Sequence, residues 1–138
     1  MTDTTLTAPP ASGRLTIRFA LLLDAVISSA TGVAYLVAAE PIGDLLGLSA
    51  GLLRALGAFF VAYGIAVWLV SRRPSGPAVA AVVAGNALWV LASLVFAIAG
   101  WEDPTTAGTV WIVLQAVIVA GFAELQVASA PWRAGQTS

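Results

Sequence analysis

The chain has few residues that could do chemistry, and the most unusual is Asp24, which interrupts the apolar run RFALLLDAVISSATGVAYL. Asp24, Ser28, Thr31 and Tyr35 follow one another at spacings of four, three and four residues, so on a helix they share one face. A carboxyl group, two aliphatic hydroxyls and a phenol on one face could bind a proton, a cation or a polar molecule. The same groups could instead hydrogen-bond a neighbouring helix.

Two later apolar segments carry polar residues that could meet this face. Asn86 and Ser93 lie seven residues apart, and Gln115 supplies a further amide. With helices beginning near residues 16 and 77, a rise of 1.5 Å per residue places Asp24 and Asn86 at one depth, about 12–14 Å from the same end. We therefore expect Asp24 to contact Asn86, with Gln115 close enough in depth to join them.

This polar set has two interpretations. Asp24 and Asn86 could lock two helices together, as interhelical polar pairs do inside membranes at about 0.6–2 kcal/mol each. Alternatively they could line a cavity for a proton, a cation or a polar small molecule, because ionisable groups inside membranes often mark such pathways. In either case the acid must face protein or water rather than lipid.

Several reactive residue types are missing from the sequence. There is no His and no Cys, and the single Met is Met1, so the usual ligands of haem, copper, zinc and iron–sulfur clusters are absent. We expect no metal, no cofactor and no enzymatic activity. A net charge of −1, with six arginines and no lysine, argues against a nucleic-acid partner.

The composition is that of a membrane protein, since 59% of the 138 residues are hydrophobic and only 9% are charged. Four apolar segments near the length needed to span a bilayer cover residues 16–39, 51–71, 77–100 and 106–128. They predict an all-α transmembrane four-helix bundle within residues 14–130. Residues 1–13 are predicted to form a disordered arm and residues 131–138 a polar tail.

The arginines predict the orientation. Five of the six lie at the ends or links that share one side of the bundle, which the positive-inside rule makes cytoplasmic together with both termini. The charges predicted at the inner interface are Arg18, Arg72, Arg73 and Glu124, and those at the outer interface are Asp44, Arg54, Glu102 and Asp103. Arg54 is expected to pair with Asp44 or with the acids of the second outer loop.

The two outer connections contain helix-boundary signals. Pro41 suits the first position of a short helix, Gly47 can end that helix, and Ser49 can cap the next one. Asp103 and Pro104 form a predicted N-cap and first-turn pair for the last helix.

Two further features bear on packing. Gly57 and Gly64 share one face of the second apolar segment and would let another helix approach closely.

The five tryptophans are predicted to anchor the helices at the membrane interface, with the exception of Trp89, which falls in the middle of a segment.

The motifs LLLDAV, PIGDLLGL, GLLRALGAFF, NALWVLASL and DPTTAGTVWIVLQAVIVAGFAELQ span about residues 20 to 126. Through them the chain resembles a family of small four-span bacterial integral membrane proteins of unassigned function, common in actinobacteria. The resemblance implies a multi-pass protein of the bacterial plasma membrane, and it carries over no catalytic residue.

These observations favour a structural or accessory component of a membrane complex, or a homo-oligomer, in contact with the lipid bilayer. The alternative is a proton-coupled, cation or small-molecule transporter that uses Asp24 and Asn86.

Overall fold

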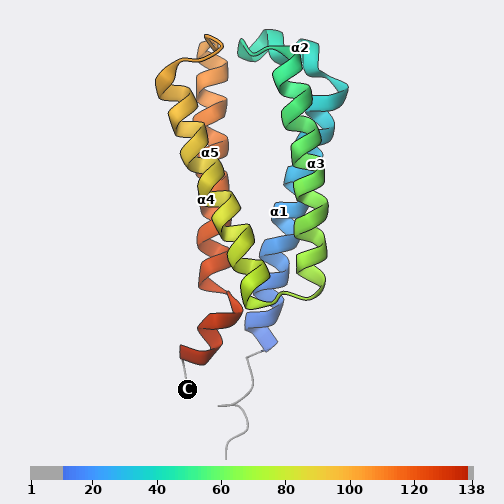
Figure 1. The fold of residues 1–138 in the computed structure, drawn as a ribbon, viewed down its shortest axis with the longest axis vertical. Helices are drawn as coiled ribbons and strands as arrows, with labels where there is room; N and C mark the ends of the chain where they lie inside the picture. Colours follow the sequence, from blue (N-terminus) through green and yellow to red (C-terminus); the bar gives the residue numbers. More distant parts are fainter. Residues whose placement is uncertain (1–10, 137–138) are drawn as a thin grey trace, which may run out of the picture.

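The computed structural model describes residues 11–136, all of whose regular elements are helical (Figure 1). In chain order these are α1 (Ala11–Val37), α2 (Ala39–Leu46), α3 (Ala50–Arg72), α4 (Gly76–Ala99), α5 (Thr106–Ala128) and the 3₁₀ helix η2 (Pro131–Gln136). Four helices, α1, α3, α4 and α5, are long and apolar enough to cross a membrane. The predicted all-α bundle of four membrane-spanning helices is therefore confirmed.

The helix boundaries differ from the predicted ones at both ends of the chain. Helix α1 begins at Ala11, so it takes up the last three residues of the predicted disordered arm. The rest of that arm, residues 1–10, lies outside the described residues. At the other end, η2 forms within the predicted polar tail, and the apolar span of the last helix runs on to Arg133.

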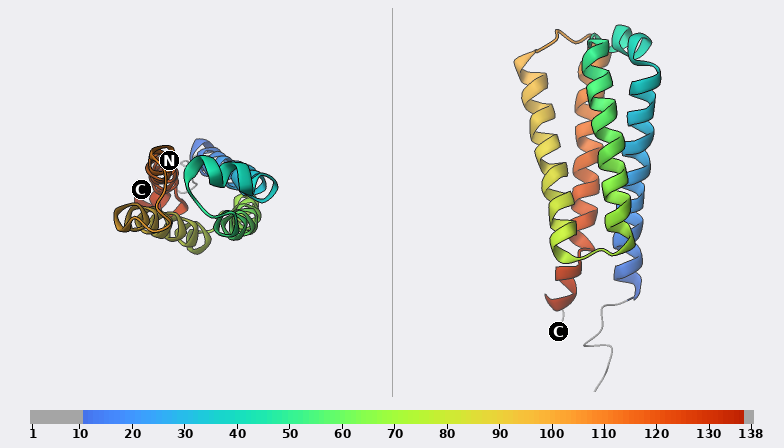
Figure 2. Two further views of the ribbon diagram at one scale, coloured as in Figure 1. Left: turned by 90° about the horizontal axis from the view of Figure 1, so that it is seen from above. Right: turned by 45° about the vertical axis from the view of Figure 1, so that its right-hand side comes forward.

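The bundle consists of two antiparallel helix pairs, α1 with α3 and α4 with α5 (Figure 2). The pairs meet near the end where α1 begins and η2 lies, and they are further apart at the end that carries α2 (Figure 1). We call these the terminal end and the α2 end of the bundle. Because each long helix reverses direction, both ends of the described chain lie at the terminal end.

Glycines allow the close approach within the first pair. A Cβ atom added at Gly57 would lie 2.8 Å from the carbonyl oxygen of Gly32, and one added at Gly64 would lie 2.9 Å from that of Ala25. Both distances are too short for a real side chain, so α1 and α3 can pack at this separation only with glycine at these positions. The predicted role of Gly57 and Gly64 is confirmed.

A buried apolar cluster joins the two pairs near the terminal end. It draws on α1, α3 and α4, and on the segment between α5 and η2; its members are Ile17, Leu21, Ala25, Val67, Val79, Val82 and Ala130. Many other large apolar side chains are exposed on the outside of the bundle, among them Phe19, Leu88 and Ile98. An exposed apolar surface of this kind suits a protein whose solvent is lipid.

The short connection before α3 matches its sequence signals. Gly47 ends α2 in the left-handed conformation, with φ of 72°, and the Ser49 hydroxyl accepts a hydrogen bond from the backbone N–H of Leu52 at 3.2 Å. Helix α2 begins at Ala39, however, so Pro41 takes its third position rather than its first. A proline is tolerated there because the first turn of a helix has no internal partner for its N–H groups.

The predicted range of the last helix, 106–128, agrees with α5, but its predicted N-cap is wrong. Thr105, not Asp103, is the N-cap of α5, and its hydroxyl accepts from the N–H of Gly108 at 3.0 Å. Asp103 instead has a positive φ of 53° within the turn. The same threonine hydroxyl donates to the carbonyl of Leu45 at 2.8 Å, which ties the loop to α2 and moves the helix start beyond the proline.

Candidate functional site

Asp24 lies at the centre of a buried hydrogen-bonded network between the two helix pairs. Its side chain is 1% exposed. Its Oδ2 atom accepts from Asn86 Nδ2 at 2.9 Å and from Gln126 Nε2 at 2.8 Å. The predicted contact between Asp24 and Asn86 is therefore confirmed, and it links α1 to α4.

Three further hydrogen bonds complete the network. Asn86 Nδ2 also donates to Gln126 Oε1 at 3.0 Å, the Tyr63 hydroxyl donates to Asn86 Oδ1 at 2.7 Å, and the Ser28 hydroxyl donates to Asp24 Oδ1 at 3.1 Å. All four long helices thus contribute a side chain. We call Asp24, Ser28, Tyr63, Asn86 and Gln126 the Asp24 network.

The local sequence explains how these side chains are buried. On α4, Val79, Val82 and Asn86 recur at helical spacing and form its buried face. On α5, Phe122 and Gln126 are one turn apart and both are buried. Each amide is therefore carried into the interface by apolar neighbours on the same face of its helix.

The network contains a buried acid without a cationic partner in the described part of the chain, yet its polar atoms are hydrogen-bonded. Among the described residues, every buried side-chain nitrogen or oxygen has a hydrogen-bond partner, and no arginine forms an ion pair with Asp24. All three side-chain groups that contact Asp24 donate to it, as a carboxylate requires. The buried acid is thus held by neutral donors alone.

Sequence reasoning missed two members of the network, Tyr63 and Gln126. Gln115 was the amide expected near Asp24, but Gln126 takes that place. The expectation failed because the apolar span continues beyond the end of α5 at Ala128, through η2, to Arg133. The depth of Asp24 therefore falls nearer the end of α5 than it would if the span ended with that helix. The sequence could have indicated Gln126, because it lies eleven residues after Gln115 and the two therefore share one helix face.

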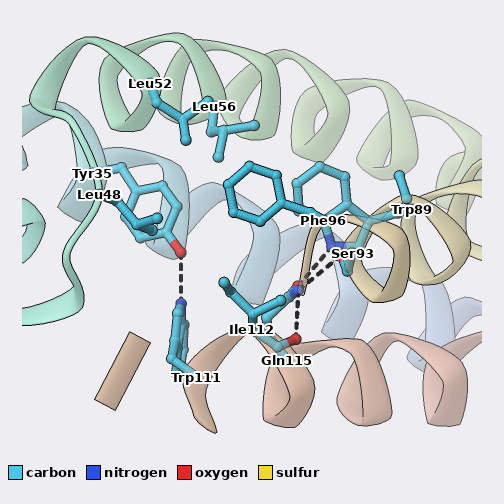
Figure 3. Close-up of a pocket in the computed structure, with 11 residues that line it drawn as sticks. Tyr35, Leu48, Leu52, Leu56, Trp89, Ser93, Phe96, Trp111, Ile112 and Gln115 are labelled. Atoms are coloured by element: carbon cyan, nitrogen blue, oxygen red, sulfur yellow. Dashed lines mark hydrogen bonds between the residues drawn. The ribbon is translucent and has the colours of Figure 1, made fainter. Parts of the chain in front are cut away.

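Gln115 belongs to a second polar layer, nearer the α2 end (Figure 3). Its Oε1 atom accepts from Trp89 Nε1 at 2.6 Å, and its Nε2 atom donates to the Ser93 hydroxyl at 3.0 Å. Beside it, Trp111 Nε1 donates to the Tyr35 hydroxyl at 2.7 Å. The expected single polar site is therefore divided into two layers. Trp89, the predicted exception to interfacial anchoring, hydrogen-bonds inside the bundle.

Three cavities lie along the interface between the helix pairs. One of about 150 Å³ at the α2 end is bordered by Tyr35, Ser93 and Gln115, and is drawn in Figure 3. A second, of about 60 Å³, shares Tyr35 and Gln115 with the first and is also lined by Thr31 and Ser28. A third, of about 260 Å³, shares Ser28 with the second and reaches Asn86.

The inner charges predicted from the sequence lie at the terminal end. Arg18 Nε donates to the carbonyl of Ser71 at 3.1 Å, and the Arg72 guanidinium lies 5.3 Å from the centre of the Trp68 ring. The remaining two predicted residues at this interface, Arg73 and Glu124, are exposed. Arg18 thus joins α1 to the end of α3, and none of the four side chains takes part in the Asp24 network.

The predicted outer charges form two different contacts. Arg54 pairs with Glu40 at 3.6 Å, and not with Asp44 or an acid of the second outer loop, so the expected pairing is wrong. Glu102 accepts from the backbone N–H of Ser49 at 2.8 Å, and this hydrogen bond lowers the pKa of the Glu102 carboxyl below its ordinary value. Both contacts are exposed at the α2 end.

Fold and site together define a small multi-pass membrane protein with a buried polar network between two helix pairs. No group of three acidic side chains that could hold a metal ion occurs within the described part of the chain. No protein-family model, curated protein or solved structure matches this chain.

Proposed function

We propose that this chain is a non-catalytic protein of the bacterial plasma membrane, a structural or accessory component of a membrane complex or of a homo-oligomer, in which the Asp24 network clamps the two helix pairs together. The observation that carries the proposal is the complete hydrogen bonding of the network. Asp24, Asn86 and Gln126 satisfy one another across three helices, and Asp24 has no cationic partner among the described residues.

The packing explains why a clamp is needed. Close helix approach at glycines holds α1 against α3, while the long helices of the two pairs lie further apart towards the α2 end (Figure 1). There the pairs are joined by hydrogen bonds such as that from Trp111 to Tyr35 and that from Thr105 to the carbonyl of Leu45. Apolar contacts alone give little preference for one helix partner in lipid, because the solvent is itself apolar. Directional hydrogen bonds from α4 and α5 to Asp24 supply this preference at the level of Asp24, in addition to the hydrogen bonds at the α2 end.

A second candidate function is transport of a proton, a cation or a small molecule. The observation that favours it is the series of three cavities, which follows the interface from the α2 end to Ser28 and Asn86. A permeant species could use such a series only if Asp24 exchanged its present partners for that species. The transport function therefore requires a carboxyl group at position 24, whereas the clamp requires only its hydrogen bonds.

The substitution Asp24→Asn separates these functions. An asparagine keeps the shape: its carbonyl oxygen can accept from Asn86 and Gln126, and its amide can donate to the Ser28 oxygen. The protein would be reconstituted into liposomes that contain a pH-sensitive dye, and proton entry would be followed under an imposed membrane potential. For the accessory function, we expect wild type and Asp24→Asn to match protein-free liposomes, and the variant to restore whatever phenotype a gene deletion causes.

Proton entry in the wild type that Asp24→Asn abolishes would contradict the accessory function and establish transport. Loss of complementation by a folded, inserted Asp24→Asn protein would also contradict it. A useful control is Asp44→Asn, which changes an exposed acid on α2 that lies outside the network.

A further inference from the structure

The cavity at the α2 end contains two hydroxyl groups whose protons have no acceptor within the described part of the chain. The Tyr35 oxygen accepts from Trp111 Nε1, and the Ser93 oxygen accepts from Gln115 Nε2, but neither hydroxyl donates to a described residue. Both side chains are buried, with 7% of Tyr35 and 6% of Ser93 exposed. A buried hydroxyl that accepts but does not donate leaves a hydrogen-bonding capacity unused.

Apart from Gln115, the remaining walls of this cavity are apolar or aromatic. Trp89, Phe96 and Trp111 surround the space from α4 and α5, and Leu52 and Leu56 close it from α3 (Figure 3). None of the described residues that line it is charged. A charged ligand would therefore lose its hydration without gaining an ionic partner, which disfavours ions.

The size of the cavity limits the ligand further. Its volume is about 150 Å³. An apolar protein cavity of about 150 Å³ holds one benzene molecule. Aromatic walls also favour a ring, since ring pairs are most stable in offset or edge-to-face arrangements.

We propose that this cavity binds a small uncharged ring compound that carries a carbonyl oxygen, with the ring against the aromatic walls and the oxygen accepting a hydrogen bond from the hydroxyl of Tyr35 or Ser93. The ligand supplies the acceptor that the protein lacks at these two groups. The inference goes beyond the proposed accessory function and does not depend on Asp24.

The test compares two ligands of nearly equal shape. Acetophenone has a ring and a carbonyl, and α-methylstyrene replaces the carbonyl oxygen by a CH₂ group that cannot accept a hydrogen bond. Binding would be measured by ligand-observed NMR on the protein in lipid nanodiscs, with protein-free nanodiscs correcting for partition into lipid. We expect the wild type to bind the ketone about tenfold more tightly than the alkene, the effect of one hydrogen bond.

Two variants connect that preference to the cavity. Tyr35→Phe and Ser93→Ala remove the two hydroxyls, and Trp111→Phe is added because Tyr35→Phe alone would free the indole N–H to bond the ketone in place of the hydroxyl. Gln115 Nε2 keeps its hydrogen bond to the carbonyl of Ile112 at 3.0 Å, so the triple variant is expected to lose most of the preference for the ketone. Leu52→Ala changes the wall without touching a hydroxyl, so it should shift both affinities together and keep their ratio. Because the ratio is compared within each variant, a general loosening of the cavity does not imitate the loss of a hydrogen bond.

Three outcomes would overturn the inference. The wild type could fail to bind either ligand above the protein-free level, as it would if lipid chains fill the cavity. It could bind both ligands equally, as a plain apolar cavity would. The triple variant could also retain the full preference for the ketone.

Discussion

Asp24 accepts three hydrogen bonds from neutral side chains, and each donor is itself fixed by the packing around it. The contact with Asn86 could be predicted because both residues interrupt apolar segments at the same depth. Gln126 and Tyr63 could not be placed in the same way, since their positions depend on how far α5 extends and how α3 is rotated. The spacing of polar residues in the sequence can thus predict a contact between two of them. The members of a larger network can be identified only from the tertiary structure.

Gln126→Leu tests the network at this scale. The substitution removes one donor to Asp24 and one acceptor of Asn86, so we expect the free energy of unfolding to fall by about 1–3 kcal/mol. Chemical unfolding in a mild detergent measures the change. The control is Ser129→Ala, one turn further along, whose hydroxyl bonds only to the carbonyl of Leu125 in its own helix turn. Equal stability of the two variants would argue against the network.

Among the elements, the close approach of another helix to α3 could be predicted from Gly57 and Gly64, whereas the N-cap of α5 could not be predicted. Close approach needs only that small residues recur on one face, which sequence spacing reveals directly. The N-cap of α5 depends on the hydrogen bond from Thr105 to α2, a contact between residues sixty positions apart. Local cap signals at Asp103 and Pro104 are outweighed by that tertiary contact.

Gly57→Ala should separate α1 from α3. The new methyl group would meet the backbone oxygen of Gly32, and a backbone atom cannot turn aside. We expect a loss of about 1–3 kcal/mol in the free energy of unfolding from such overpacking. Gly51→Ala is the matched control on the same helix, because a Cβ there has no neighbour within 4 Å. If Gly51→Ala is equally destabilising, close approach is not the cause.

The contact between Glu102 and Ser49 should make stability depend on pH. Its hydrogen bond lowers the pKa of Glu102 in the folded protein below the ordinary value of 4.5. The contribution of this hydrogen bond to the free energy of unfolding is therefore complete above pH 4.5, and it is lost as the pH falls through the lower pKa of the folded protein. Thermal unfolding at neutral and acidic pH should show a smaller acid-induced loss for Glu102→Gln than for the wild type. Identical pH profiles would contradict this prediction.

The whole molecule is two helix pairs that share a buried junction, with both ends of the described chain at one end of the bundle (Figure 2). Composition and segment length were sufficient to predict four apolar helices. They could not predict the pairing or the separation towards the α2 end, because these follow from which small and polar residues face each other after assembly.

Orientation in the membrane is a prediction for the molecule as a whole. Five of the six arginines belong to the terminal end, so that end should be cytoplasmic by the positive-inside rule. A reporter that fluoresces only in the cytoplasm, fused after Ser138, should be bright. A dark fusion together with an active periplasmic reporter at the same site would reverse the orientation.

The most direct test of the clamp is the free energy of unfolding of Asp24→Asn and Asp24→Ala, measured side by side in one detergent. Alanine deprives Asn86 and Gln126 of a shared acceptor, so we expect a loss of about 1–3 kcal/mol. Asparagine can accept from both amides and donate to Ser28, so it should retain most of the wild-type stability. An asparagine variant as unstable as the alanine variant, or an alanine variant as stable as the wild type, would contradict the account.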